Sequence, residues 1–321
     1  MMKAISNYTS GLIHETGESW NHFWFEPYRG PALDRLRIAT GCIALLWWLS
    51  FLPHLSLWLG EEGLLPLDTL RNLVGAGSQR IYRFSWFYAG ESPFIIGGLW
   101  GLGLLAILLH TLGLFGRVST ALAWSFVIST VHRMPMIAGL MEPVLTMSLA
   151  YLIIGSSNRL GLLTGRLFPK RIPRAPSPLG DHLSRVSLRL LQIHTLFFYV
   201  VMATTQLRHD TWWEGEALWT MLAASETRPI DLSWLGTTPL ALNLITQAVI
   251  IFEIAFPILI WKASLRPLLI FLSGIFWIVL GLSSGLLLYC LLMFFLGLAF
   301  WPDPQKTEAS ECDGETLPPE N

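Results

Sequence analysis

The sequence predicts an all-α protein, a polytopic transmembrane helical bundle of about eight spans with amphipathic interfacial helices. Hydrophobic residues make up 53% of the 321 residues and charged residues only 13%, against about 25% charged in a soluble protein. The charges are also unevenly distributed, because long stretches contain none. The formal net charge of −1 gives no basic surface for nucleic acid, so we expect no nucleic-acid partner.

Four charge-free stretches give five of the predicted spans. They lie between Arg37 and Glu61, Glu91 and Arg117, Arg189 and Arg208, and Arg266 and Asp303. A bilayer core is crossed by about 20 helical residues, so each of the first three stretches fits one span. The last would extend roughly 50 Å as one helix, and we divide it at residues 281–285, whose sequence is GLSSG.

Three further spans come from less uniform stretches, at residues 117–135, 137–155 and 239–261. The second of these has Glu142 and Pro143 near its start, and the third contains one acid, Glu253. The chain is thus divided into an interfacial segment at residues 1–35, a transmembrane domain at 36–301 and an acidic tail at 302–321 that we expect to be disordered. In the interfacial segment, Trp20, Phe23 and Trp24 can share one helix face.

Basic residues predict the orientation of the bundle. Lys and Arg are concentrated in the termini and in the loops that follow the second, fourth and sixth predicted spans. The loop after the fourth span, at residues 156–183, has the most and contains FPKRIPRAPSPLGD. Cytoplasmic loops carry an excess of these residues. We therefore expect a protein of the cytoplasmic (inner) membrane with both termini in the cytoplasm.

Ionisable side chains within spans are candidates for function, because they are costly there. Glu253 and His194 lie at similar predicted depths in neighbouring spans, so an intramembrane polar pair is geometrically possible. Such a pair could handle a proton or a ligand, but the simpler interpretation is a hydrogen bond that holds two helices together.

The predicted fifth span also carries a polar stripe. Its members recur at steps of three and four residues and are Gln192, Thr195, Tyr199, Met202 and Gln206. Facing a cavity, the stripe could bind the head group of a quinone or a lipid. Facing a neighbouring helix, the stripe would only pack against that helix. The sequence does not favour either of these two interpretations.

Titratable residues also gather at the predicted outer ends of the spans. They are His132, Arg133 and Glu142 around the third and fourth spans, and Arg208, His209, Asp210 and Glu214 after the fifth. Convergence on one rim would suit general acid–base chemistry, whereas ordinary solvated helix ends have the same composition.

Several segments resemble the horizontally transferred transmembrane (HTTM) family, bacterial relatives of the vitamin K-dependent gamma-carboxylase. The first is GRVSTALAWSFVISTVHRMPMIAGLMEPVLTMSLAYLIIG, with Gly116-Arg117, Arg133-x-Pro135, Gly139 and Glu142. The others are YVVMATTQLRHDTWWEGEALW, with Trp212, Glu214 and Gly215, and EIAFPILIWKASLRP, with Glu253, Pro257 and Arg266. The resemblance covers roughly residues 29–301.

The resemblance implies a reduced quinone, similar to vitamin K, as cofactor, and an outward-opening cavity. In the carboxylase a lysine at the end of the fifth span is the base toward this quinol, and the matching position here is Gln206, whose amide cannot replace it. Glutamyl carboxylation is therefore not expected. The implied site has His209, Glu214 and Gln206 as candidate catalytic residues, with Tyr199, His132, Arg133, Glu142 and Trp212 around the ligand.

Three functions are consistent with this sequence. The first is a quinol-linked membrane enzyme that binds a quinone or another lipidic ligand. The second is a non-catalytic binding or assembly subunit with a membrane-protein partner, and the third is a transporter, for which no inverted repeat is seen. Membrane lipids are expected partners of all three, and no metal is predicted, because the sequence has no paired Cys-x-x-Cys ligands.

Overall fold

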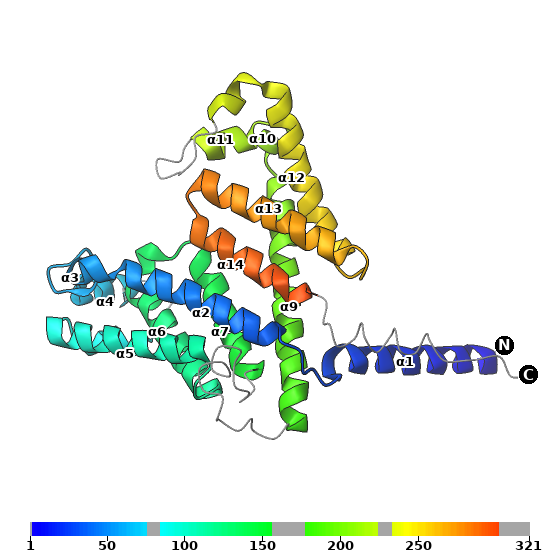
Figure 1. The fold of residues 1–321 in the computed structure, drawn as a ribbon, viewed down its shortest axis with the longest axis horizontal. Helices are drawn as coiled ribbons and strands as arrows, with labels where there is room; N and C mark the ends of the chain where they lie inside the picture. Colours follow the sequence, from blue (N-terminus) through cyan, green and yellow to red (C-terminus); the bar gives the residue numbers. More distant parts are fainter. Residues whose placement is uncertain (1, 76–83, 156–176, 224–232, 302–321) are drawn as a thin grey trace, which may run out of the picture.

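The computed structural model describes residues 2–75, 84–155, 177–223 and 233–301, and all regular structure in these ranges is helical (Figure 1). The α-helices are α1 (Met2–Phe25), α2 (Ala32–Ser50), α3 (Leu55–Leu59), α4 (Leu67–Gly75), α5 (Pro93–Leu112), α6 (Arg117–Arg133), α7 (Met141–Gly155), α9 (Pro178–Gln206), α10 (Asp210–Trp213), α11 (Ala217–Ala223), α12 (Pro239–Leu259), α13 (Arg266–Ser284) and α14 (Leu287–Gly297). Short 3₁₀ turns η1 (Leu52–His54), η2 (Trp86–Ala89), η3 (Pro135–Ile137), η4 (Ser233–Thr237) and η5 (Leu298–Phe300) link several of them.

Five helical segments are long and apolar enough to cross a membrane. They are Ala32–Leu59, which runs from α2 through η1 to α3, and the helices α5, α9, α12 and α13. Two shorter apolar segments are Met141–Gly155 and Leu287–Phe300, and α6 adds a helix of 17 residues. Each of the eight stretches selected from the sequence therefore contains a helix, and the chain has the composition and helix lengths of a membrane protein.

Large apolar side chains cover the outer surfaces of these helices. On α12 the exposed residues include Leu244, Ile251 and Ile258, spaced at seven residues, and on α13 they include Phe271 and Ile275. Soluble monomers rarely expose continuous apolar surfaces of this kind. Lipid tails are the solvent that suits them.

The longest helix, α9, extends beyond the stretch that the sequence predicted for it. It begins at Pro178, about three turns before the charge-free stretch. The charged residues of these turns are paired: Asp181 with Arg29 at 2.8 Å, and Arg185 with Glu26 at 2.9 Å. Because the partners come from the segment between α1 and α2, the charge-free stretch alone places the start of α9 too late.

Helix α9 packs against α7, α12, α1 and α14. In Figure 1 it runs vertically, with α2, α5, α6 and α7 on its left, α1 on its right and α12 beside and above its upper part. The amphipathic α1 meets α9 near its start, where the Arg189 guanidinium lies 4.1 Å from the Phe23 ring centroid and donates to the Phe23 carbonyl. The rings of Trp20 and Trp24 lie 5.8 Å apart, as expected for residues on one helix face.

Proline and glycine set two helix boundaries. Helix α7 begins at Met141, not at residue 137, because residues 135–137 form η3; Pro143 is tolerated in the first turn of α7, where no helical N–H bond is lost. Helix α13 ends at Ser284 and is followed by Gly285 with φ of 76°, a left-handed cap that favours glycine. The break between the last two helices is therefore at residues 285–286, at the end of the predicted division at 281–285.

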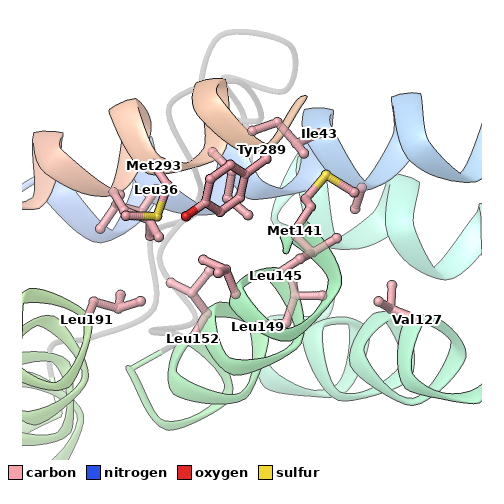
Figure 2. Packing of buried hydrophobic residues seen from close by; sticks show 14 of the residues in the cluster. Leu36, Ile43, Val127, Met141, Leu145, Leu149, Leu152, Leu191, Tyr289 and Met293 are labelled. Carbon is pink, nitrogen blue, oxygen red and sulfur yellow. The ribbon is translucent and has the colours of Figure 1, made fainter. Parts of the chain in front are cut away.

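The core lies between α2, α7, α9 and α14 (Figure 2). In Figure 2 Leu145, Leu149 and Leu152 of α7 face the layer formed by α2 and α14, which carries Ile43 and Tyr289, and the three leucines are nearly or fully buried. In a lipid environment such packing is favoured by close van der Waals contact more than by exclusion of water.

Some predicted segments lie outside the described residues. These are the acidic tail at 302–321 and most of the basic connector at 156–183, of which only residues 177–183 are described.

Two glycines of α5 test the packing against α2. A Cβ added at Gly103 would overlap the indole of Trp48, which is 1% exposed, whereas a Cβ added at Gly101 meets nothing within 4 Å. We expect Gly103→Ala to lower the free energy of unfolding by about 1–3 kcal/mol. Gly101→Ala, the matched control, should leave it unchanged or raise it slightly, because alanine favours helix. Thermal unfolding in detergent measures both, and equal effects would contradict this packing.

Candidate functional site

Tyr199 lies at the centre of a polar cluster between α9, α12, α13 and α14. Its side chain is fully buried, and its hydroxyl lies 2.9 Å from the Ser273 hydroxyl and accepts a hydrogen bond of 2.6 Å from the Trp277 indole. The Phe256 ring stacks on the phenol ring at 4.4 Å between centroids. The position of Tyr199 is therefore determined by Phe256 on one face of its ring and by two partners at its hydroxyl.

Gln206 and Glu253 form the second part of this cluster. Gln206 ends α9, and its side-chain amide donates to Oε1 of Glu253 at 3.1 Å. Glu253 is fully buried. Its other oxygen, Oε2, and the amide oxygen Oε1 of Gln206 are both buried and have no hydrogen-bond partner among the described residues. Two hydrogen-bond acceptors next to each other are thus unsatisfied, which is uncommon inside a protein.

Tyr289 of α14 completes the cluster. Its hydroxyl donates to the Met202 sulfur at 3.9 Å. We define the Tyr199–Glu253 cluster as Tyr199, Met202, Gln206, Glu253, Ser273, Trp277 and Tyr289. The sequence identified its members on α9 and α12 but missed Ser273, Trp277 and Tyr289. Ser273 and Trp277 are four residues apart on α13, so one helix face carries both, and this spacing was the available signal.

Pro257 lies one turn beyond Glu253 in α12. A proline has no backbone N–H, so it cannot donate the helical hydrogen bond to the carbonyl four residues earlier, which is the carbonyl of Glu253. The acid of the cluster therefore lies in the turn of α12 that lacks one backbone bond.

The other members of the stripe on α9 are packing residues. Gln192 donates to the Ala299 carbonyl at 2.8 Å, and Thr195 donates to the Leu191 carbonyl of its own helix at 2.7 Å. Both are buried. For Gln192 and Thr195, the structure therefore supports helix packing and not ligand binding.

The predicted pair of His194 and Glu253 is wrong. The imidazole Nδ1 of His194 lies 3.0 Å from the Tyr151 hydroxyl, while Glu253 bonds Gln206, which is about 18 Å further along α9. The prediction compared depths counted from the ends of charge-free stretches. Because α9 begins about three turns earlier than its stretch, the two depths were not comparable.

Residues His132, Arg133 and Glu142 lie at the corner between α6 and α7, and each has structural partners. Arg133, which is fully buried, donates to the carbonyls of Leu65 and Leu59 and to Glu91 at 2.9 Å. The nearby imidazole and carboxylate are also bound: His132 Nδ1 lies 2.7 Å from the Phe84 carbonyl, and Glu142 accepts from the Trp47 indole and the Gly139 amide.

The residues predicted after the fifth span lie elsewhere, in and around α10. The side chains of His209 and Glu214 are exposed and that of Trp212 is half-buried. The backbone carbonyls of this segment are bound to α12: those of Trp212, Glu214 and Gly215 accept from Gln247, Asn243 and Thr246. Figure 1 shows α10 beyond the upper end of α9, away from α6 and α7. The structure does not bring the two groups together on one rim.

The described residues contain no group of three His, Cys, Asp or Glu side chains close enough to hold a metal ion. Comparison of the chain with protein-family models, with curated proteins and with solved structures finds no match. The resemblance to the HTTM family therefore depends on the motifs in the sequence.

The Arg133 site gives a test of the α6–α7 corner. Arg133→Met removes the charge from a buried pair. It leaves the carbonyls of Leu59 and Leu65 without the Arg133 donor, and leaves Glu91 with only the Leu67 amide. We expect a loss of about 3–5 kcal/mol in the free energy of unfolding, as for other broken buried pairs. Arg71→Met is the control, because the Arg71–Asp68 pair is exposed. A similar loss in both variants, measured by thermal unfolding, would contradict the role given to Arg133.

Proposed function

We propose that this chain is a membrane protein whose Tyr199–Glu253 cluster binds the head group of a quinone or of another lipidic ligand. One observation carries the proposal: Glu253 Oε2 and Gln206 Oε1 are buried acceptors without a donor. A quinol hydroxyl, or the hydroxyl of a lipid head group, is a donor of the right kind for both.

The surroundings suit a flat, apolar molecule. Phe252 and Phe276 pack 5.3 Å apart between ring centroids beside Tyr199 and Trp277. Gln206 is only half-buried, and Val201 on the preceding turn is exposed. The cluster thus extends from the buried Tyr199 to the partly exposed Gln206 at the end of α9.

The proposed activity is quinol-linked redox chemistry and not glutamyl carboxylation. Gln206 offers hydrogen bonds but cannot remove a proton from a quinol, and its neighbour Arg208 stays protonated. In this proposal Gln206 and Glu253 orient the head group. The proposed topology has about eight crossings of the inner membrane, from the apolar stretches of the sequence. Both termini lie in the cytoplasm in this topology, because the basic residues are concentrated in the loops on that side.

A second candidate is a non-catalytic subunit that assembles with another membrane protein. His209 and Glu214, the predicted catalytic residues, favour this candidate because their side chains are exposed. Among the described residues, neither has a hydrogen bond to the Tyr199–Glu253 cluster. In that case the Gln206–Glu253 bond serves to join α9 to α12.

Mass spectrometry of the quinones and lipids that co-purify with the detergent-solubilised protein tests the proposal. We expect a stoichiometric quinone in the wild type. Gln206→Ala and Glu253→Gln should each lower its retention about tenfold, because each removes an acceptor worth about 1.4 kcal/mol or more. Thr204→Val is the control, since Thr204 is exposed on the same turn of α9 and bonds only its own helix.

The variants must elute as the wild type does in size-exclusion chromatography. Quinone that is absent from all the folded proteins would contradict the ligand and favour the assembly subunit. Equal retention in wild type and all variants would place a bound quinone outside the Tyr199–Glu253 cluster.

A further inference from the structure

A pocket lies at the end of the bundle where α2, α6 and α9 begin and α7 ends. It is lined by residues 28–30 before α2, by the first turns of α2 and α9, by the last turn of α7 and by Thr120 of α6. We define these surroundings as the Arg37 pocket. None of the residues of the Tyr199–Glu253 cluster lines it.

Arg37 is the unusual member of this pocket. It is 5% exposed, and its Nη1 pairs with Asp34 at 2.9 Å. Its Nε and Nη2 atoms are buried and have no hydrogen-bond partner among the described residues. A guanidinium is always charged, and its fork of N–H groups matches the oxygens of a carboxylate or a phosphate. A buried guanidinium with two unused donors has the chemistry to bind an anionic group.

The guanidinium is held in place by the end of α5. Gly113 caps α5 with φ of 71°, and a Cβ there would lie 2.6 Å from the Arg37 Cζ. The side chain thus lies directly against a backbone that only glycine suits, both for its conformation and for its space. Such a fixed donor loses little entropy when a ligand binds.

Carboxylates balance the arginines in the same pocket. Asp34 pairs with Arg37, and Asp181, which is 5% exposed, pairs with Arg29 at 2.8 Å. Two basic and two acidic side chains would repel neither sign of charge. A group that carries a phosphate beside an ammonium matches this arrangement better than a simple anion does.

The place of the pocket indicates the source of such a group. The ends of several helices meet there, and in a bundle that crosses a bilayer these ends lie at the level of the head groups. We propose that the Arg37 pocket binds the head group of a zwitterionic phospholipid, with the phosphate on Arg37 and the ammonium beside Asp34 and Asp181. This proposal depends on the chain lying in a membrane, and not on a quinone at the Tyr199–Glu253 cluster.

Titration of delipidated wild-type protein in detergent, followed by native mass spectrometry, tests it. The probes are dioctanoyl phosphatidylethanolamine, dioctanoyl phosphatidylglycerol, which lacks the ammonium, and dioctanoyl glycerol, which also lacks the phosphate. We expect saturable binding in that order of affinity, with at least one step of about tenfold. Equal binding of all three would overturn the proposal, as would the absence of saturable binding.

Soluble phosphoethanolamine distinguishes the two sources of the head group. Binding as tight as that of the lipid would support the recognised chemistry and assign it to a soluble phosphate ester, whereas much weaker binding supports the lipid.

Variants then locate the site. Arg37→Gln should lower the affinity for phosphatidylethanolamine about tenfold. Arg37→Lys should lower it less, because lysine keeps the charge. Arg71→Gln is the matched control, as Arg71 is exposed and outside the pocket. If Arg37→Gln does not fold, Asp181→Asn replaces it and should reduce the preference for phosphatidylethanolamine over phosphatidylglycerol. Unchanged binding in folded variants would overturn the assignment. Quinone content measured on the same samples separates this result from that of the Tyr199–Glu253 cluster.

Discussion

Charged and polar side chains inside this apolar bundle must find their partners within the chain, and the arrangement of helices depends on that constraint. Arg133 reaches two backbone carbonyls and Glu91, and so fixes the end of α6 against the segment that follows α2. Arg185 and Asp181 do the same for the start of α9, since their partners precede α2. Apolar packing alone distinguishes helix faces poorly in lipid, because lipid tails are as apolar as leucine. The polar contacts therefore specify which helices are neighbours.

The sequence predicted the helices well and their contacts poorly, for one physical reason. Helices α5 and α12 follow directly from apolar length, and Gly285 marks the break between α13 and α14. The start of α9 was missed because its charges are neutralised by residues about 150 positions away, and no local pattern records that pairing.

The candidate site shows the same limit. Tyr199, Gln206 and Glu253 were identified because polar groups are rare in apolar helices, and each has a side-chain hydrogen bond to a neighbouring helix: Tyr199 to Ser273, and Gln206 to Glu253. The partner proposed for Glu253 was wrong, since it required the relative shift of two helices along their axes. A short sequence motif contains no information about that shift, and the same is true of the two groups of titratable residues that do not share a rim.

The missing backbone bond of α12 has a mechanical consequence. Before Glu253 in the chain, the side chains of Asn243, Thr246 and Gln247 bind α12 to the segment after α9. After Glu253, the Phe256 ring packs on Tyr199. The first turns of α12 are thus anchored to the segment after α9, and its last turns to Tyr199. The missing helical bond, from Pro257 to the Glu253 carbonyl, lies in these last turns. A helix bends most easily at such a turn. The direction of the end of α12, which carries both Glu253 and Phe256, is therefore the least constrained part of this helix.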